Sequence, residues 1–469
     1  MHFPSRALPP LLLSFAHLAA QSPICSDLSR ITALANEEMT SIAGLPGLCL
    51  QIDQHGQNLY RQAFGSYTLQ QVVPLASATK MLSAAVLMAL VDQQLLQLDD
   101  PVGTYLPEYA VPPRDQITLR MCFSHTSGLP RSTSWESNSS ITLRQAAQNI
   151  ATVPLSYLPG TAFEYGSAAM QVAGAVCEVV SGMTWAQLFQ QKLAVPLGFI
   201  ATDYNAFGLH ANPRIAGGAR SNLQDYGRFV EMLRAGGAWN GTQVLSAAAV
   251  DAMMTDNTSH LPTVYSPSPY GSPYGIGCWI DQKDSAGRTT HVSSPGFYGF
   301  TGWVDRARDV TGVYLINYNG YLTFPYFFRF VAATDAALSP IGVGCVGAGS
   351  PSCGTEPRLN ASTWARAGLA DYRFRVDDAP ANTAGLLLLD LAPQTLPSQV
   401  LGLSIWIGLP APVTGGLMSD AQGHAELQSS LAGIAAGQTF ALQSVWLDGG
   451  GCGAFGVRAS HALTVSVQP

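Results

Sequence analysis

The sequence predicts an α+β domain followed by a smaller all-β domain. Helical patterns of apolar residues fill the middle of the first 340 residues, and strand-like patterns lie at both ends of that stretch. A segment rich in Gly, Ser and Pro follows at 342–354. Beyond it, residues 363–469 carry only short strand patterns separated by Gly and Pro, which is typical of a β-sandwich. A chain of 469 residues is also long enough for two domains.

The elements of the first domain follow from local periodicity. Residues 28–42 have helical spacing, and the partly alternating segments 47–53 and 59–67 predict a hairpin around Gly56. Residues 77–96 form the most apolar helical pattern in the chain. Further helices are expected at 168–188 and 223–235, and strands at 276–280, 301–304, 312–317, 401–407, 440–446 and 462–467.

The N-terminus is typical of a signal peptide at 1–20. Arg6 provides a positive charge, residues 8–18 are mostly apolar, and small residues follow for cleavage. The alternative is an ordinary N-terminal segment. We therefore expect an exported protein, periplasmic or extracellular. The expected boundaries are a signal peptide at 1–20, a first domain at 21–340, a linker at 341–362 and a second domain at 363–469.

The eight cysteines fit an oxidising compartment. Cys345 and Cys353 flank the Gly/Ser/Pro-rich loop and form the predicted disulfide, whereas the sequence leaves the other pairings open. Cys177 lies in a predicted helix and fits a buried free thiol. The chain has no C-x-x-C pair, so zinc-ribbon and thioredoxin readings have no support.

The charge pattern excludes two classes of partner. The net charge is −7, and Lys and Arg form no cluster that would attract nucleic acid or an anionic membrane. After the N-terminal segment, no apolar run reaches the roughly 18–20 residues of a membrane span. Neither nucleic acid nor a membrane span is therefore predicted.

The stretch Ser-Ala-Thr-Lys at 77–80 carries the clearest chemical signal. In a helix, Ser77 and Lys80 share one face. A serine needs a neighbouring base to act as a nucleophile, and a lysine whose pKa is depressed by burial supplies one. The alternative is a surface serine beside a solvated lysine. However, Ala84 and Leu87 share the lysine's face, and a lysine on an apolar face is costly without a role.

Further motifs follow in a recognisable order. Residues 124–130 read Ser-His-Thr-Ser-Gly-Leu-Pro, and residues 159–165 read Pro-Gly-Thr-Ala-Phe-Glu-Tyr. With the stretch around Ser77, they give residues 28–335 a pattern that resembles the superfamily of serine β-lactamases, D,D-peptidases and family VIII esterases, of the class C β-lactamase-like type. The matching stretches are 73–80, 96–102, 124–130, 159–165, 196–199 and 217–221.

This resemblance implies a β-lactamase-like antiparallel sheet flanked by helices. It also implies that Ser77 is the nucleophile of a serine hydrolase, that Lys80 assists it, and that Tyr165 exchanges a proton with the serine and the leaving group. A core tyrosine is the alternative for Tyr165. His125 is expected to be structural. The chain has no G-x-S-x-G motif, which argues against an α/β-hydrolase.

Two motifs depart from the family's pattern. The usual Tyr-x-Asn ends here in Ser167, which lacks the paired donor and acceptor of an amide. The third motif looks like Ser294-Pro-Gly296 and so lacks a cation often used to hold a β-lactam carboxylate. The backbone N–H groups of Ser77 and Phe297 are the expected oxyanion hole, with Ser167, Ser294 and Gly296 in supporting positions.

We interpret the chain as an exported serine hydrolase that cleaves an ester or amide bond through an acyl-enzyme. An esterase or peptidase is favoured over a β-lactamase because the carboxylate-holding cation is missing. The alternative is a catalytically silent binding protein on the same fold. The second domain is interpreted as a binding or attachment module, or as a structural appendage. No cofactor or metal is predicted, the expected partner is a small-molecule or peptide-like substrate, and the oligomeric state is left open.

Overall fold

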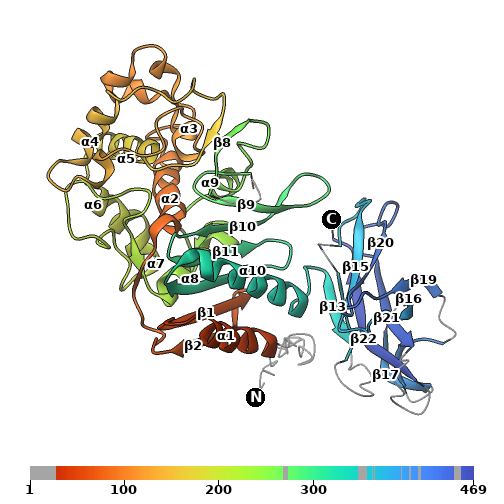
Figure 1. The fold of residues 1–469 in the computed structure, drawn as a ribbon. Coiled ribbons are helices and arrows are strands. Elements are labelled where there is room, and N and C mark those ends of the chain that lie inside the picture. Colours follow the sequence, from red (N-terminus) through yellow and green to blue (C-terminus); the bar gives the residue numbers. More distant parts are fainter. Residues whose placement is uncertain are drawn as a thin grey trace, which may run out of the picture.

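The computed structural model describes residues 28–267, 273–346, 356–361, 363, 365–391, 393–400, 403–409, 413–447 and 456–468. The first part combines an antiparallel sheet with helices, and the described residues after it form strands (Figure 1). The predicted α+β fold with a C-terminal strand-rich region is confirmed. The helices are α1 (Ser29–Ser41), α2 (Thr79–Asp92), α3 (Leu119–Phe123), α4 (Leu143–Ile150), α5 (Ala168–Ser181), α6 (Trp185–Phe189), α7 (Val195–Leu197), α8 (Leu223–Arg234), α9 (Ala247–Met253) and α10 (Gly320–Ala337).

A six-stranded antiparallel sheet forms the centre of the first part, in the order β2-β1-β12-β11-β10-β9. The predicted hairpin is the β1–β2 pair, and β12 pairs with β1, so both ends of this part of the chain meet inside one sheet. The strands are β1 (Gly47–Gln54), β2 (Gln57–Gly65), β9 (Trp279–Lys283), β10 (Thr289–Pro295), β11 (Gly299–Asp305) and β12 (Val310–Asn317). The shorter strands are β3 (Val73–Pro74), β4 (Phe163–Glu164), β5 (Arg220–Ser221), β6 (Ala238–Trp239), β7 (Thr242–Gln243) and β8 (Thr263–Tyr265).

Alternate residues of the central strands face two different cores. In β1, Leu48 and Leu50 pack in the core that contains α1 and α10. Cys49 packs instead in the core that contains α2 and α8. This alternation follows from the two-residue period of a strand. Helices therefore cover both faces of the sheet, which explains why every residue of β1 is buried.

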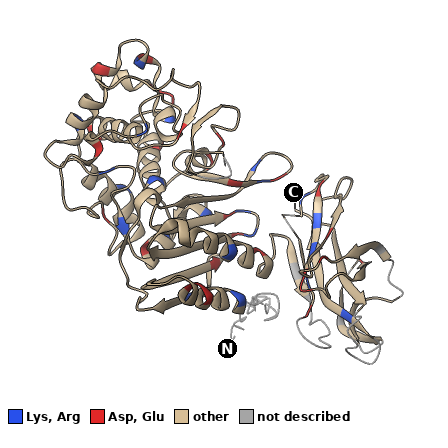
Figure 2. Ribbon diagram, in the orientation of Figure 1, with Lys and Arg blue, Asp and Glu red and all other residues tan. Residues whose placement is uncertain are grey.

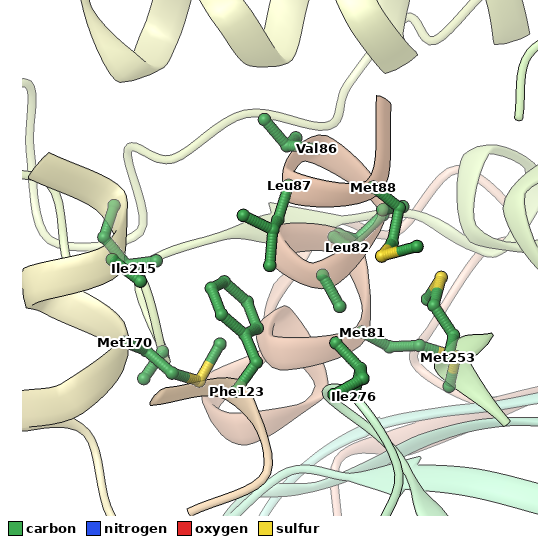
Figure 3. Close-up of a cluster of buried hydrophobic side chains, with 14 of the residues drawn as sticks. Met81, Leu82, Val86, Leu87, Met88, Phe123, Met170, Ile215, Met253 and Ile276 are labelled. Carbon is green, nitrogen blue, oxygen red and sulfur yellow. The ribbon is translucent and has the colours of Figure 1, made fainter. Parts of the chain in front are cut away.

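Helix α2 is buried on all sides and organises the larger core. Residues 79–90 are all buried. Figure 3 shows Met81 and Leu87 of this helix among side chains from distant segments, including Phe123 and Ile276. A helix that is apolar all round belongs in a protein interior. The predicted apolar helix therefore lies at the centre of the domain, where its first turn is held rigidly.

Glycines with a positive φ change the bounds of two predicted elements. The helix expected at 168–188 is divided into α5 and α6, because Gly182 adopts a φ of +69° and ends α5. The strand expected at 276–280 begins later, as β9, because Gly277 has a φ of +81°. At Gly277, a Cβ would lie 2.6 Å from the carbonyl oxygen of Lys80, so this glycine allows close packing against α2.

The C-terminal region contains a five-stranded sheet, ordered β13-β22-β21-β16-β19, and a three-stranded sheet, ordered β14-β15-β20. The two sheets share one apolar core. The linker predicted at 341–362 is partly wrong, since β13 pairs with β22 and β14 pairs with β15. The strands are β13 (Val343–Val346), β14 (Arg358–Ala361), β15 (Tyr372–Asp377), β16 (Ala384–Asp390), β17 (Pro393–Val400), β18 (Leu403–Ile407), β19 (Val413–Met418), β20 (Ala425–Ser429), β21 (Thr439–Leu447) and β22 (Val457–Ser466).

Two sequence predictions fall outside the described residues: the signal peptide at 1–20 and Cys353, the expected partner of Cys345. Cys177 is a buried free thiol, as expected. In the described parts of the chain, no single helix is long and apolar enough to cross a membrane. Helix α5 and the segment 185–197 together have the length and apolar composition of a membrane span, but they are bent by 78° relative to each other. Figure 2 shows acidic and basic residues interspersed along the chain.

Candidate active site

Ser77 lies in a strained turn at the start of α2. Strand β3 pairs with β5 and ends just before a 3₁₀ turn, Ala76–Ala78, that leads into the helix. Ala76 adopts a φ of +45°, a left-handed conformation that a residue with a side chain rarely occupies. Strain of this kind costs about 1–3 kcal/mol and persists where the surrounding structure enforces it. Here the β3–β5 pairing and the buried helix fix the position of Ser77.

Lys80 is brought onto Ser77 as the helical spacing predicts. Its Nζ donates to Ser77 Oγ at 3.1 Å and to the carbonyl oxygen of Ala216 at 3.0 Å. The side chain is buried, and burial lowers the lysine's pKa to about 7. No carboxylate among the described residues forms an ion pair with Lys80. A large fraction of this amine is therefore neutral near pH 7 and can accept a proton from Ser77.

Tyr165 completes the group from a different part of the chain. It follows β4, which pairs with β8, and its N–H donates to the carbonyl oxygen of Tyr265 at 3.0 Å. Lys80 Nζ lies 4.6 Å from the centre of the Tyr165 ring, and Ser77 is close enough to the phenol to affect its pKa. Burial raises the pKa of Tyr165, so the side chain is a neutral phenol at neutral pH. The three side chains thus form one group that contains a partly neutral amine and a neutral phenol.

An aromatic cluster holds Tyr165 in place. The ring stacks on Trp279 with centroids 5.2 Å apart and meets Tyr274 edge-on at 5.8 Å. His125 lies 4.6 Å from Tyr165, and its Nδ1 faces the N–H of Gly166 at 3.4 Å. Burial, with the nearby charge of Lys80, lowers the pKa of His125 well below its usual range, so the imidazole is neutral. His125 thus contacts the Tyr165 ring as a neutral side chain, which agrees with its expected structural role.

Two of the predicted supporting residues, Ser294 and Gly296, lie beside the turn that carries Ser77. Ser294, near the end of β10, places its Oγ 3.4 Å from the carbonyl oxygen of Ser77. At Gly296, a Cβ would lie 2.0 Å from the carbonyl oxygen of Leu75, so a side chain does not fit there. Within the described residues, the N–H groups of Ser77 and Phe297 make no hydrogen bond. Both N–H groups are therefore unpaired within the described part of the chain, as the expected oxyanion role requires.

Ser167 is placed differently from the other predicted residues. Its Oγ donates to Oε1 of Glu136 at 2.8 Å rather than to Ser77 or Lys80. The buried carboxylate of Glu136 also accepts from the backbone N–H of Thr133. Among the described residues, no hydrogen bond joins Ser167 to Ser77 or Lys80, and the serine anchors the neighbouring loop instead. Glu136 and the carbonyl of Ala216 were missed from the sequence because only long-range contacts bring them to the site.

These features define a class of protein: a serine hydrolase with a Ser–Lys pair at the start of a core helix, on a β-lactamase-like fold. A family model described as "Beta-lactamase" matches residues 33–325. The chain belongs to this family.

Three relatives and two solved structures are similar to parts of this chain. The chain is 27% identical to a lovastatin esterase of Penicillium rubens over 56% of its own length and 86% of the relative's, and 26% identical to esterase EstB of Burkholderia gladioli over 58% and 86%. It is 29% identical to the D-alanyl-D-alanine-carboxypeptidase/endopeptidase AmpH of Escherichia coli, over 34% of this chain and 46% of AmpH.

A putative β-lactamase from Bacteroides dorei has a similar structure, with a TM-score of 0.60 and 28% identity over 66% of this chain and 98% of that one. The structure of SurE with D-Leu matches more of the chain, 85%, and 98% of SurE, with a TM-score of 0.55 at 21% identity. The second likeness concerns the fold alone, and it reaches into the C-terminal region.

Proposed function

We propose that the protein cleaves an ester or amide bond by transferring the acyl group to Ser77. The observation that carries this proposal is the hydrogen bond of 3.1 Å between Ser77 Oγ and a buried Lys80 whose pKa is lowered to about 7. A neutral amine at this distance can take the hydroxyl proton while Oγ bonds to the substrate's carbonyl carbon. The oxygen that becomes negative is then held by the N–H groups of Ser77 and Phe297.

Tyr165 supplies the second proton transfer. As the tetrahedral intermediate collapses, the bond to the leaving group breaks and the phenol gives its proton to the leaving oxygen or nitrogen. The proton held by Lys80 restores the phenol. Water then attacks the acyl group, is deprotonated by Lys80, and a proton returns to Ser77 as the acid leaves. Each proton taken from Ser77 or from water is thereby returned, and the site is restored.

An ester or peptide-like amide is favoured over a β-lactam as the substrate. The stretch Ser294-Pro-Gly296 offers no cation at the third motif, so a β-lactam carboxylate has no charged partner there. Two of the relatives are named as esterases and a third as a carboxypeptidase, which supports the same preference. Export is part of the proposal, and it is supported by the signal-like segment at 1–20.

The first test is intact mass after incubation with a fluorophosphonate, for the native chain and for Ser77→Ala. A single adduct on the native protein that is absent from Ser77→Ala is the expected result. Turnover of short-chain esters, D-amino-acid amides and a chromogenic cephalosporin then ranks the substrates. A folded native protein that acquires no adduct contradicts the proposal and favours a silent binding protein on this fold.

A further inference from the structure

Arg131 is fixed beside Tyr165 by its main chain. Its carbonyl oxygen accepts the N–H of Ser167 at 2.8 Å. The intervening Gly166 packs so closely that a Cβ there would lie 2.3 Å from the same carbonyl oxygen. The main chain at Arg131 is therefore held tightly against the segment that carries Tyr165.

The side chain of Arg131 is also held in a defined direction. Its guanidinium carbon lies 4.2 Å from the centre of the Tyr265 ring. Tyr265 is the residue whose carbonyl oxygen accepts the N–H of Tyr165. The guanidinium therefore stacks on the ring of a residue that is hydrogen-bonded through its main chain to the proposed proton donor, and the Arg131 side chain is exposed to solvent. Stacking of this kind fixes the plane of a guanidinium and leaves its N–H edge free.

No carboxylate of the described residues pairs with Arg131. Most other arginines of the first part have such a partner; Arg120, for example, binds Asp99, and Arg220 binds Asp203. The undescribed segment 268–272, close to Tyr265 in sequence, reads Ser-Pro-Tyr-Gly-Ser and contains no acidic residue. Within the described residues, the guanidinium is thus oriented by an aromatic ring and lacks its preferred planar anionic partner.

We propose that Arg131 determines specificity by binding a carboxylate on the leaving-group portion of the substrate. The inference rests on the proposed function, because Tyr165 protonates the leaving atom and the leaving group must therefore lie beside Tyr165. A planar guanidinium matches a carboxylate through two parallel hydrogen bonds. The preferred substrates are then esters or amides whose alcohol or amine product carries a carboxylate.

A matched pair of esters tests this inference: 3-(butanoyloxy)benzoate and its neutral analogue 3-(butanoyloxy)benzamide. The measured quantity is the ratio of kcat/KM for the ester that carries the carboxylate to kcat/KM for the ester that carries the neutral carboxamide. We expect the native ratio to be well above one and to fall about tenfold or more in Arg131→Gln. In Arg131→Lys the ratio should fall less, because lysine keeps the positive charge but cannot make the two parallel hydrogen bonds of a guanidinium. The native ratio is also expected to fall with added salt, since the rim is exposed.

Arg329→Gln is the matched control. Arg329 also stacks on an aromatic ring, with its guanidinium carbon 5.1 Å from the centre of Tyr326, but it lies on α10 on the other side of the sheet. It should change neither the ratio nor the rates. The inference is overturned if Arg131→Gln lowers both rates equally, if the native ratio is near one, or if neither ester is cleaved by a protein whose Ser77 accepts a fluorophosphonate. Loss of the Ser77 adduct itself would instead contradict the proposed function.

Discussion

The Nζ of Lys80 lies 3.1 Å from the Oγ of Ser77 in a buried site that contains no counter-charge for the ammonium among the described residues. Burial alone accounts for the lowering of the lysine's pKa to about 7. A buried cation without an ion-pair partner destabilises the fold, and the same condition makes the amine a usable base. The proton affinity of Lys80 therefore affects both the reaction and the stability of the protein.

The reaction should respond to pH through Lys80. We expect kcat/KM for a simple ester to rise about tenfold per pH unit below pH 7 and to level off above it, because the neutral amine accepts the Ser77 proton. Initial rates measured at low substrate concentration on both sides of pH 7 check this. The rate of Ser77 labelling by a fluorophosphonate should follow the same curve. A profile that is flat through pH 7 would remove Lys80 from the role of base.

Replacing the lysine should stabilise the protein. Because the pKa of Lys80 is lower in the folded than in the unfolded state, the unfolded chain binds more protons between about pH 7 and about pH 10, and native stability rises with pH over that window. Lys80→Met should therefore be inactive yet more stable below pH 7, by up to a few kcal/mol, with an advantage that shrinks toward pH 10. Urea unfolding at acidic and alkaline pH measures this difference.

Lys192→Met serves as the control for that measurement. Lys192 binds Gln93 at an exposed position, so its removal should leave the pH dependence of stability as it is in the native protein. The account of Lys80 fails if Lys80→Met is less stable than the native protein by the same amount at both pH values.

The local part of the site is predictable from sequence, and the long-range part is not. The separation of Ser77 and Lys80 places both side chains on one helical face whatever the rest of the chain does. The carbonyl of Ala216, by contrast, reaches Lys80 only because β3 pairs with β5. Ser167 meets Glu136 for a similar reason, since the two residues lie far apart in sequence. Contacts of this kind depend on tertiary packing, which the local spacing of apolar residues in the sequence does not predict.

The same distinction applies to the elements. Apolar patterns predicted a helix at α2 and strands at β1 and β12, because burial enforces those patterns, although the helix expected at 77–96 ends at Asp92. The break between α5 and α6 and the late start of β9 depend on Gly182 and Gly277, and their left-handed backbone is chosen by the surrounding packing. The strand pairing of β13 was hidden by a composition typical of a linker.

Tyr165→Phe should separate the acid role from simple packing. The phenyl ring keeps the stacking on Trp279 but cannot protonate a leaving group. We expect kcat for an alkyl ester to fall by roughly 10²–10⁴-fold, with a much smaller loss for a p-nitrophenyl ester, whose leaving group departs without protonation. Tyr105→Phe, which removes a hydroxyl bonded to Asp100 away from the site, should leave both rates unchanged. Equal losses for the two esters would contradict the assignment.

Gly296→Ala should disable the site by steric displacement. The new Cβ would lie 2.0 Å from the carbonyl oxygen of Leu75, which directly precedes the turn that carries Ser77. Either the turn or the N–H of Phe297 must move, so we expect ester turnover and Ser77 labelling to fall by about 10²-fold or more, as when one oxyanion donor is lost. Overpacking should also lower stability by about 1–3 kcal/mol. Gly416→Ala is the control, since a Cβ there meets no atom within 4 Å. Labelling of Gly296→Ala at the native rate would show that this close approach does not support the reaction.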